Sequence, residues 1–349
     1  MNALAHGLDR VRLGWLQLLG PLTTPFVRSR ELRSSTSLVL SISLAFFLTC
    51  VAPLELLAIG PLVMGVPHLA ADVRYLVLRP GLHRRPAFWV AVVAPLVALG
   101  ATASSWLGFV AVCGAALALP RQWTARRIAI ALGALVLAGL AWQMPRTMGP
   151  VMAHVHNLVA VSFFVAWPAL VARRRESRWH WLPTGLFVVL ALAIFAGLVD
   201  PLALDVGGIA VRDGFGTPLD LHTYSLAPRA VDPSSALAMR LVLFFAFAQS
   251  VHYGAWLRAI PDEDRPRATP RTFRAAFQAM REEGSYPVMV LFLVLAIALG
   301  IWAAFDVYAA RMGYLRGALF HGYLELAVAA VLVASPGRKL AELAQRGAA

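Results

Sequence analysis

Charged residues are scarce in this 349-residue sequence: Asp, Glu, Lys and Arg make up only 14% of it, whereas hydrophobic residues make up 59%. About a quarter of the residues in an average soluble domain are charged, so this composition argues against a soluble fold. Several uncharged runs are long enough to cross a membrane, and such segments satisfy their backbone groups in lipid by forming helices. We therefore expect an all-α fold, a polytopic transmembrane helical bundle.

Cysteine is almost absent as well. The sequence has Cys50 and Cys113, and both fall within apolar runs, so neither a disulfide framework nor a cysteine metal site is expected. A Gly-rich phosphate loop, a nucleotide motif and an internal repeat are also missing. The net charge is +13, but in a polytopic protein the positions of the basic residues matter more than their sum. We expect membrane lipid and a small lipid-soluble molecule as partners, and no nucleic acid.

Apolar segments of about 15 to 25 residues predict roughly ten membrane spans. They are 36–52, 54–78, 87–103, 105–119, 128–143, 149–171, 182–200, 236–257, 285–308 and 314–335. The run 87–119 forms either one span or two. We favour two, divided at "TASSW", because a single span would reverse all later spans and place the basic segment "RRRESR" outside the cell.

The basic residues also indicate the orientation. With a cytoplasmic N-terminus, 25 of the 31 Lys and Arg residues lie in cytoplasmic segments, which agrees with the positive-inside rule. We expect a bacterial inner-membrane protein with both termini in the cytoplasm. The predicted parts are an interfacial segment at 1–35, a transmembrane domain at 36–336 with an outer loop at 201–235 and an inner loop at 258–284, and a tail at 337–349.

Histidines inside the predicted spans are the main candidates for a functional site, because ionisable groups in lipid are costly unless they are paired or face a protein interior. All of them lie in even-numbered spans, which are parallel in this topology. Their predicted depth is roughly 8 to 20 Å below the outer face at about 1.5 Å per residue. We predict one shared metal site formed from His68, His154, His156, His252 and His321.

His154 and His156 cannot both face this site. Two residues of helix turn their side chains about 200° apart, so at most one of them is expected to be a ligand. Asn157 shares the face of His154 and slightly favours that residue. The sequence leaves the choice open.

Two carboxylates each follow a histidine by four residues, which is about one helical turn on the same face. Asp72 follows His68 in "PHLAAD", and Glu325 follows His321 in "HGYLE". This spacing suits a carboxylate that orients a metal-binding imidazole, and it also suits a simple buried hydrogen bond. We predict that Asp72 and Glu325 support the metal ligands in catalysis.

Coordination that is rich in imidazole and free of cysteine suits iron, copper or zinc. A site in the bilayer has direct access to apolar substrates and dissolved oxygen, which favours an oxygenase. Two other functions remain open at this point. In a haem-binding cytochrome, two histidines would ligate the haem iron axially, and in a proton-coupled transporter, His and Asp/Glu would form a relay. The oligomeric state is not indicated.

The stretch "MGVPHLAAD" resembles the Gly-x-Pro-His-Gly-x-x-Asp signature of the Brp/Blh-type membrane β-carotene dioxygenases. The matching residues are Gly65, Pro67, His68 and Asp72. This resemblance implies that His68 helps to hold a non-haem iron, that other span histidines complete the site, and that the enzyme cleaves a double bond of a carotenoid. Iron is therefore the expected metal.

A second stretch, "FAQSVHYGAWLRAI", is similar to a later histidine-bearing helix of that family, through His252 and loosely Arg258. Two positions depart from the pattern: Leu69 stands where the family has glycine, and Trp256 stands where it has a second histidine. We expect His321, or a histidine of the sixth span, to take the place of the missing ligand.

Overall fold

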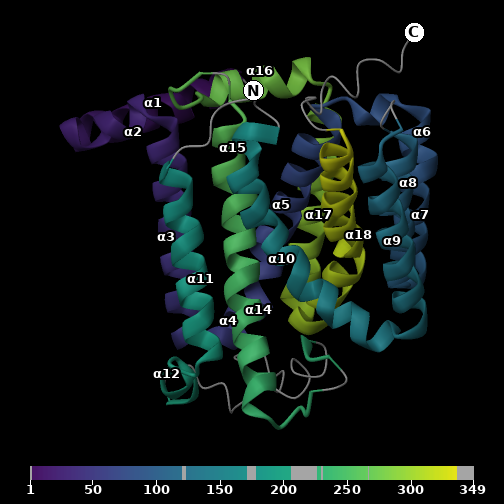
Figure 1. Cartoon of the computed structure of the whole chain (residues 1–349). Helices are drawn as coiled ribbons and strands as arrows, with labels where there is room; N and C mark the ends of the chain where they lie inside the picture. Colours follow the sequence, from purple (N-terminus) through teal and green to yellow (C-terminus); the bar gives the residue numbers. More distant parts are fainter. Residues whose placement is uncertain are drawn as a thin grey trace.

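The computed structural model describes residues 2–119, 123–170, 178–205, 226–228, 231–265 and 267–335. Every regular element in this part of the chain is a helix. Most of the helices stand side by side as a bundle, and two helices lie across one end of it (Figure 1). The predicted tail at 337–349, the basic residues at 173–177 and most of the predicted outer loop at 201–235 lie outside the described residues.

Within the described residues, seven helical segments are long and apolar enough to cross a membrane. They are Arg30–Val51 (α3), Pro53–Leu78 (with α4, Pro53–Gly60, and α5, Val66–Asp72), Ala125–Gln143 (α9), Pro145–Ala169 (in α10, Pro145–Leu170), Ala236–Glu263 (α14, Ala236–Gly254, to α15, Ile260–Glu263), Tyr286–Phe305 (α17) and Val307–Ala334 (α18). Three shorter apolar helices are Pro86–Thr102 (α6, Pro86–Phe88, to α7, Ala94–Thr102), Ser105–Ala118 (α8) and Trp181–Phe195 (α11). The ten predicted spans coincide with these ten segments, but only seven have the length required, so a count of ten remains a prediction.

The chain between residues 86 and 118 forms two packed helical segments. The first ends at Ala103, which has a left-handed φ of 55° and closes the last turn of α7. Ser104 is extended, and α8 begins directly after it. The helix therefore breaks within the "TASSW" stretch, where the sequence analysis divided the run 87–119.

Side-chain caps set the beginning of several long helices. The hydroxyl of Ser29 accepts a hydrogen bond from the backbone N–H of Leu32 at the start of α3. Ser235 and Asp306 cap α14 and α18 in the same way. Such caps satisfy backbone donors that a helix leaves unpaired at its first turn. Asp306, an ionisable residue near the end of a predicted span, is thus explained as a helix cap.

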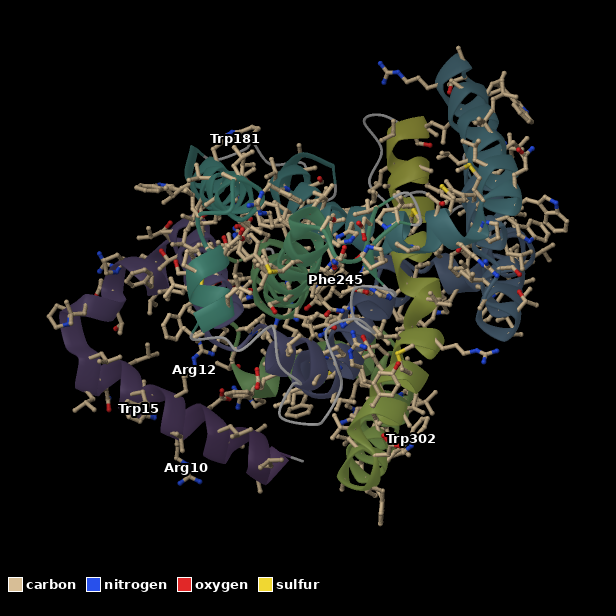
Figure 2. The ribbon with its side chains drawn as sticks, turned by 90° about the horizontal axis from the view of Figure 1, so that it is seen from below. Arg10, Arg12, Trp15, Trp181, Phe245 and Trp302 are labelled. Atoms are coloured by element: carbon tan, nitrogen blue, oxygen red, sulfur yellow. The ribbon has the colours of Figure 1, made fainter. Side chains whose placement is uncertain are left out.

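The N-terminal segment contains α1 (Asn2–Leu19) and α2 (Thr24–Arg28). α1 packs against α16 (Phe273–Glu282), and both lie across the end of the bundle where α3 begins (Figure 1). Figure 2 shows Arg10, Arg12 and Trp15 on α1 at one side of the molecule. The predicted inner loop at 258–284 therefore begins inside a continuous helix and contains α16, a helix that lies flat against α1.

Four helices run in the same direction and pack around a common interior: α5, α10, α14 and α18 (Figure 1). These are the four segments that carry the predicted histidines. Each histidine lies near the middle of its helical segment, so all four segments can present side chains to one place.

Candidate metal centre

The helical segment that carries His68 is irregular on both sides of it. A π-helical turn at Pro61–Gly65 precedes α5, and a second one at Val73–Leu78 follows it. Pro67 lacks the backbone N–H that a regular helix requires, so the hydrogen-bond ladder is interrupted here. π-helical turns inside α-helices are frequent at functional sites. The local sequence therefore produces an irregular backbone next to His68.

Gly65 allows another helix to approach this irregular turn. A Cβ atom added to Gly65 would lie 2.6 Å from the hydroxyl oxygen of Tyr314 on α18. The glycine of "MGVPH" is therefore required for close packing of α18 against the segment that holds His68.

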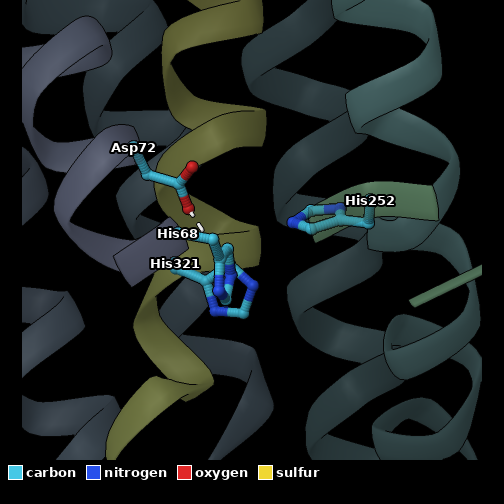
Figure 3. Close-up of side chains that lie close together, drawn as sticks. All are labelled: His68, Asp72, His252 and His321. Atoms are coloured by element: carbon cyan, nitrogen blue, oxygen red, sulfur yellow. Dashed lines mark ion pairs between the residues drawn. The ribbon is translucent and has the colours of Figure 1, made fainter. Parts of the chain in front are cut away.

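Four imidazole rings meet in the interior of the bundle, one from each of the four parallel helices. The ring of His68 lies 5.2 Å from that of His252 and 4.8 Å from that of His321, measured between ring centroids. The ring of His156 lies 5.2 Å from that of His252 and 5.0 Å from that of His321. His68, His252 and His321 are buried, and Figure 3 shows His252 facing the other two from the opposite side. These four residues are called the histidine group below.

His154 does not belong to the histidine group. Its Nε2 atom hydrogen-bonds to the backbone carbonyl of Leu226 at 2.8 Å, and its ring stacks on Phe244. Asn157 is buried, but its amide donates to the carbonyl of Ala153 on its own helix. The structure thus places His156 with the other histidines and turns His154 away, opposite to the slight preference drawn from Asn157.

Gly322 on α18 allows His156 to pack closely against this helix. A Cβ atom at Gly322 would lie 2.9 Å from the Cβ of His156 and 3.1 Å from its Cγ. Any larger residue at 322 would push the two helices or the imidazole apart. The position of His156 in the histidine group therefore depends on the small residue next to His321.

The donor atoms lie close enough to serve one metal ion. One ligand atom from each of His68, Asp72, His252 and His321 lies within 4.8 Å of the other three. Two nitrogens on opposite sides of a metal, each bonded at about 2.1 Å, are about 4.2 Å apart. Only small movements would bring these donors onto one ion.

Several polar atoms of the histidine group and of the two carboxylates beside it have no hydrogen-bond partner among the described residues. They are both ring nitrogens of His68 and of His252, Nε2 of His321, both carboxylate oxygens of Asp72 and Oε2 of Glu325. Each buried polar group left without a partner costs about 1–3 kcal/mol. Nitrogens and carboxylate oxygens orphaned in one place are the donor types that bind iron, copper or zinc, so the residues present fit a bound transition metal.

Of the two predicted histidine–carboxylate pairs, the structure shows the one between His68 and Asp72, whereas Glu325 lies next to another histidine. Asp72 Oδ2 lies 3.9 Å from His68 Nε2, one turn away as the spacing suggests. Glu325 instead pairs across helices, with its Oε1 atom 3.5 Å from His252 Nε2. Nδ1 of His321 contacts the carbonyl of Ala318 at 2.5 Å.

Trp256 holds the carboxylate of Glu325 in position. Its indole nitrogen donates a hydrogen bond to Oε1 of Glu325 at 2.6 Å, and its side chain is completely buried. The sequence comparison noted Trp256 only as a position where a histidine was missing. The structure instead makes it the partner of a residue 69 positions away.

A cavity of about 280 Å³ adjoins the histidine group and is lined mostly by apolar residues. Arg311, Tyr314 and Tyr253 also line it, and sequence analysis did not assign them to a site. One available signal was spacing, because Arg311, Tyr314, His321 and Glu325 recur along one face of a single helix.

A second polar cluster lies beyond the C-terminal end of α14, in and just after α15. Arg33 makes two contacts with the carboxylate of Asp262, at 2.6 and 2.9 Å. Asp264 accepts a hydrogen bond from Trp167 at 3.3 Å and forms an ion pair with Arg79. Burial raises the pKa of Asp264 to about 6, against the opposing effect of Arg79. These acids fall within the predicted inner loop at 258–284, where they fasten α3 and other helices to the end of α15.

Comparisons of the chain with family models, with curated proteins and with solved structures found no match. The resemblance to Brp/Blh-type dioxygenases therefore depends on the quoted motifs alone.

Proposed function

We propose that this protein is a membrane-embedded, iron-dependent oxygenase that acts on a carotenoid or another lipid-soluble substrate. The observation that carries the proposal is the histidine group, in which four helices each direct one imidazole to the same buried place. Orphaned nitrogens on three of these residues support a bound metal over a purely structural cluster. The proposed ligands are His68, His156, His252 and His321.

Glu325 and Asp72 would orient the imidazole ligands and raise their basicity. Glu325, held by Trp256, lies next to His252, and a carboxylate in this position fixes the tautomer of an imidazole and raises its basicity. Asp72 lies beside His68 and also within reach of a shared ion. Imidazole with carboxylate and no thiolate is typical of non-haem iron sites, although copper and zinc accept the same donors.

Bound iron would supply activation of O₂. In a dioxygenase reaction, each oxygen atom of O₂ is added to one carbon of a double bond, the bond between these carbons breaks, and two carbonyl products form without an external reductant. The chain itself provides an apolar cavity that binds the substrate beside the ligands, with Phe245 and Leu315 among the residues that exclude water.

The geometry favours this proposal over a haem-binding cytochrome. Each imidazole of the histidine group contacts at least two others edge-on at 4.8 to 5.7 Å between centroids. A porphyrin bound between two axial histidines requires a flat, open space that these crowded rings do not leave.

The proposed topology has ten spans, with both termini on the cytoplasmic side of a bacterial inner membrane. The partition of basic residues in the sequence supports this orientation. The structure supports a membrane location through its seven long apolar helices.

Oxygen uptake and pigment loss test the proposed activity. Expression in a strain that accumulates β-carotene should bleach the cells and yield retinal or another apocarotenal, and purified protein should consume O₂ with its substrate. Unchanged pigment in well-expressing cells would remove the carotenoid assignment. Absence of O₂ uptake with carotenoids, retinoids and unsaturated fatty acids, by protein containing iron, would contradict the oxygenase itself.

A further inference from the structure

The N-terminal helix α1 lies beside the bundle and not within it. In Figure 1 it extends sideways from the end of the bundle where α3 begins, and Figure 2, which looks along the bundle, shows it at the edge of the molecule. Most residues of α1 are exposed. The helices α1, α2 and α16 are called the end layer below.

One face of α1 packs against the segment that contains α16. Ala5 on this face is 2% exposed, and the carboxylate of Asp9 accepts a hydrogen bond from the backbone N–H of Phe273 at 2.7 Å. Arg12 points toward the bundle (Figure 2) and donates to the carbonyl of Arg271. Ala5, Asp9 and Arg12 share a face because they are spaced by four and three residues. These contacts fix the rotation of α1 about its own axis.

A second face of α1 is apolar and exposed. It consists of Leu4, Leu8, Val11, Trp15 and Leu18, which are between 37% and 75% exposed and are called the apolar stripe below. Their spacing of four, three, four and three residues places them on one side of the helix. Because Val11 directly precedes Arg12, the stripe lies about 100° around the helix from the packing face. The contact with α16 therefore leaves it uncovered.

The face opposite the stripe is mainly polar. His6, Arg10 and Gln17 are exposed on it, together with Leu13. Figure 2 shows Arg10 on the side of α1 that is turned away from the bundle, opposite Arg12. An apolar stripe on one side of a helix and polar residues on the other are typical of helices that lie in the plane of a membrane surface.

Exposed tryptophans indicate the level of the membrane surface. Trp123 precedes α9 and Trp142 lies in its last turn, and they are 69% and 67% exposed. Tryptophan is enriched at both membrane–water interfaces. These two residues are separated by about 28 Å at 1.5 Å per residue, which is close to the roughly 30 Å of a hydrocarbon core. Since α9 begins at the end of the bundle that carries the end layer (Figure 1), this layer lies at the level of one membrane surface.

The end layer carries a net positive charge. Its helices contain five arginines, Arg10, Arg12, Arg28, Arg274 and Arg281, and two carboxylates, Asp9 and Glu282. All of these arginines except Arg12 are exposed, and none of the exposed ones forms an ion pair with a described residue. Glu282 accepts a hydrogen bond from Gln278 at 2.9 Å, and Asp9 is bound to the start of α16. Arginines close to a membrane surface attract acidic phospholipids.

From these features we infer that α1 lies in the plane of the membrane surface, with its apolar stripe on the acyl chains and acidic phospholipids gathered beside the end layer. The inference goes beyond the proposed oxygenase and does not depend on a bound metal. A second copy of the chain is a poorer occupant for the stripe, because it would bring two positively charged end layers together. Lipid matches both the apolar stripe and the charge.

Fluorescent labels on single cysteines test which face of α1 meets lipid. The label NBD is attached at Val11→Cys or Leu18→Cys in the stripe, and at His6→Cys or Gln17→Cys on the polar face. All four positions are exposed, so these changes should not disturb folding. The full chain is placed in nanodiscs of phosphatidylcholine and phosphatidylglycerol. The wild-type chain, whose two native cysteines are buried, measures background labelling.

We expect doxyl-labelled lipid to quench the labels of the stripe and aqueous iodide to quench those of the polar face. Iodide quenching of the stripe labels as strong as that of the polar-face labels would overturn the inference, because the stripe would then face water. Stripe labels protected from both quenchers would also overturn it, since protein would then cover the stripe.

A comparison of two quencher lipids tests the preference for acidic head groups. At equal mole fraction, doxyl-labelled phosphatidylglycerol should quench the label at Val11→Cys about two- to fivefold more than doxyl-labelled phosphatidylcholine, because the arginines enrich the acidic lipid. Adding Arg10→Gln and Arg28→Gln should reduce this difference. Val294→Cys is the matched control, because Val294 is 55% exposed on α17, a helix without charged residues, and both lipids should quench it equally. Equal quenching by the two lipids at Val11→Cys would overturn the preference for acidic phospholipids.

Discussion

Trp256 donates a hydrogen bond from its indole nitrogen to Oε1 of Glu325 at 2.6 Å, and the same oxygen lies 3.5 Å from Nε2 of His252. The contact joins α18 to the π-helical turn at Ala255–Ala259 that follows α14. The indole therefore holds a carboxylate against an imidazole of the histidine group, at the position where the resembling family has a histidine.

Replacing this indole tests its positioning role. Trp256→Phe keeps an aromatic ring next to Phe163 and Trp167 but removes the N–H donor. We expect iron affinity to fall by about 10- to 100-fold, the usual effect of losing a partner of a metal ligand. Competition with a graded set of chelators measures it. If Trp256 only fills space, thermal stability would decrease and iron affinity would remain at its wild-type value.

Glycine at position 322 provides a test of helix approach. Gly322→Ala places a Cβ atom 2.9 Å from the Cβ of His156, so the imidazole must shift and iron content should fall. Gly317→Ala is the matched control, because a Cβ there meets nothing within 4 Å on the same helix. That control should bind iron normally and be slightly more stable, by about 0.5–1 kcal/mol, because alanine favours a helix. Equal iron content in the two variants would show that His156 is not a ligand.

The second polar cluster should affect stability and leave the metal untouched. Arg33→Gln removes two guanidinium contacts from the buried carboxylate of Asp262, which keeps only a longer one to Arg265 at 3.7 Å among the described residues. Breaking a buried ion pair on one side costs about 3–5 kcal/mol, so the midpoint of thermal unfolding in detergent should fall clearly. Arg10→Gln, at an exposed position on α1, should leave this midpoint unchanged. Loss of iron from folded Arg33→Gln protein would mean that the cluster is coupled to the histidine group.

Reporter fusions test the proposed topology. A reporter placed after Arg178 or Arg267 should behave as cytoplasmic, and one inserted at Asp232 should behave as external, because basic residues are retained on the cytoplasmic side. A cytoplasmic signal from the insertion at Asp232 would reverse the orientation of α14.

The sequence predicts the helices of this protein well, because long apolar runs in lipid have few alternatives to a helix. It also predicts which helices carry the histidines, since these stand out as costly residues in apolar surroundings. It does not predict whether His154 or His156 faces the group, because that depends on the rotation of α10 against its neighbours. A single polar residue such as Asn157 does not determine that rotation.

Contacts between distant residues are the other part that the sequence does not give. Trp256 and Glu325 are 69 positions apart, Arg33 and Asp262 are 229 apart, and Arg311 and Leu57 are 254 apart. Only the packing of the bundle brings these partners together. The spacing rule correctly places Asp72 near His68, yet it assigns Glu325 to His321 and misses its closer approach to His252.

Iron content of two variants, purified from cells supplied with iron, tests the central claim most directly. His154 and His156 lie on the same helix two residues apart, but only His156 belongs to the histidine group. We predict about one iron per chain in the wild-type protein and in His154→Ala, and a large loss in His156→Ala, because only the second variant loses a ligand. Equal iron content in the two variants, or a wild-type protein that binds no transition metal, would contradict the account.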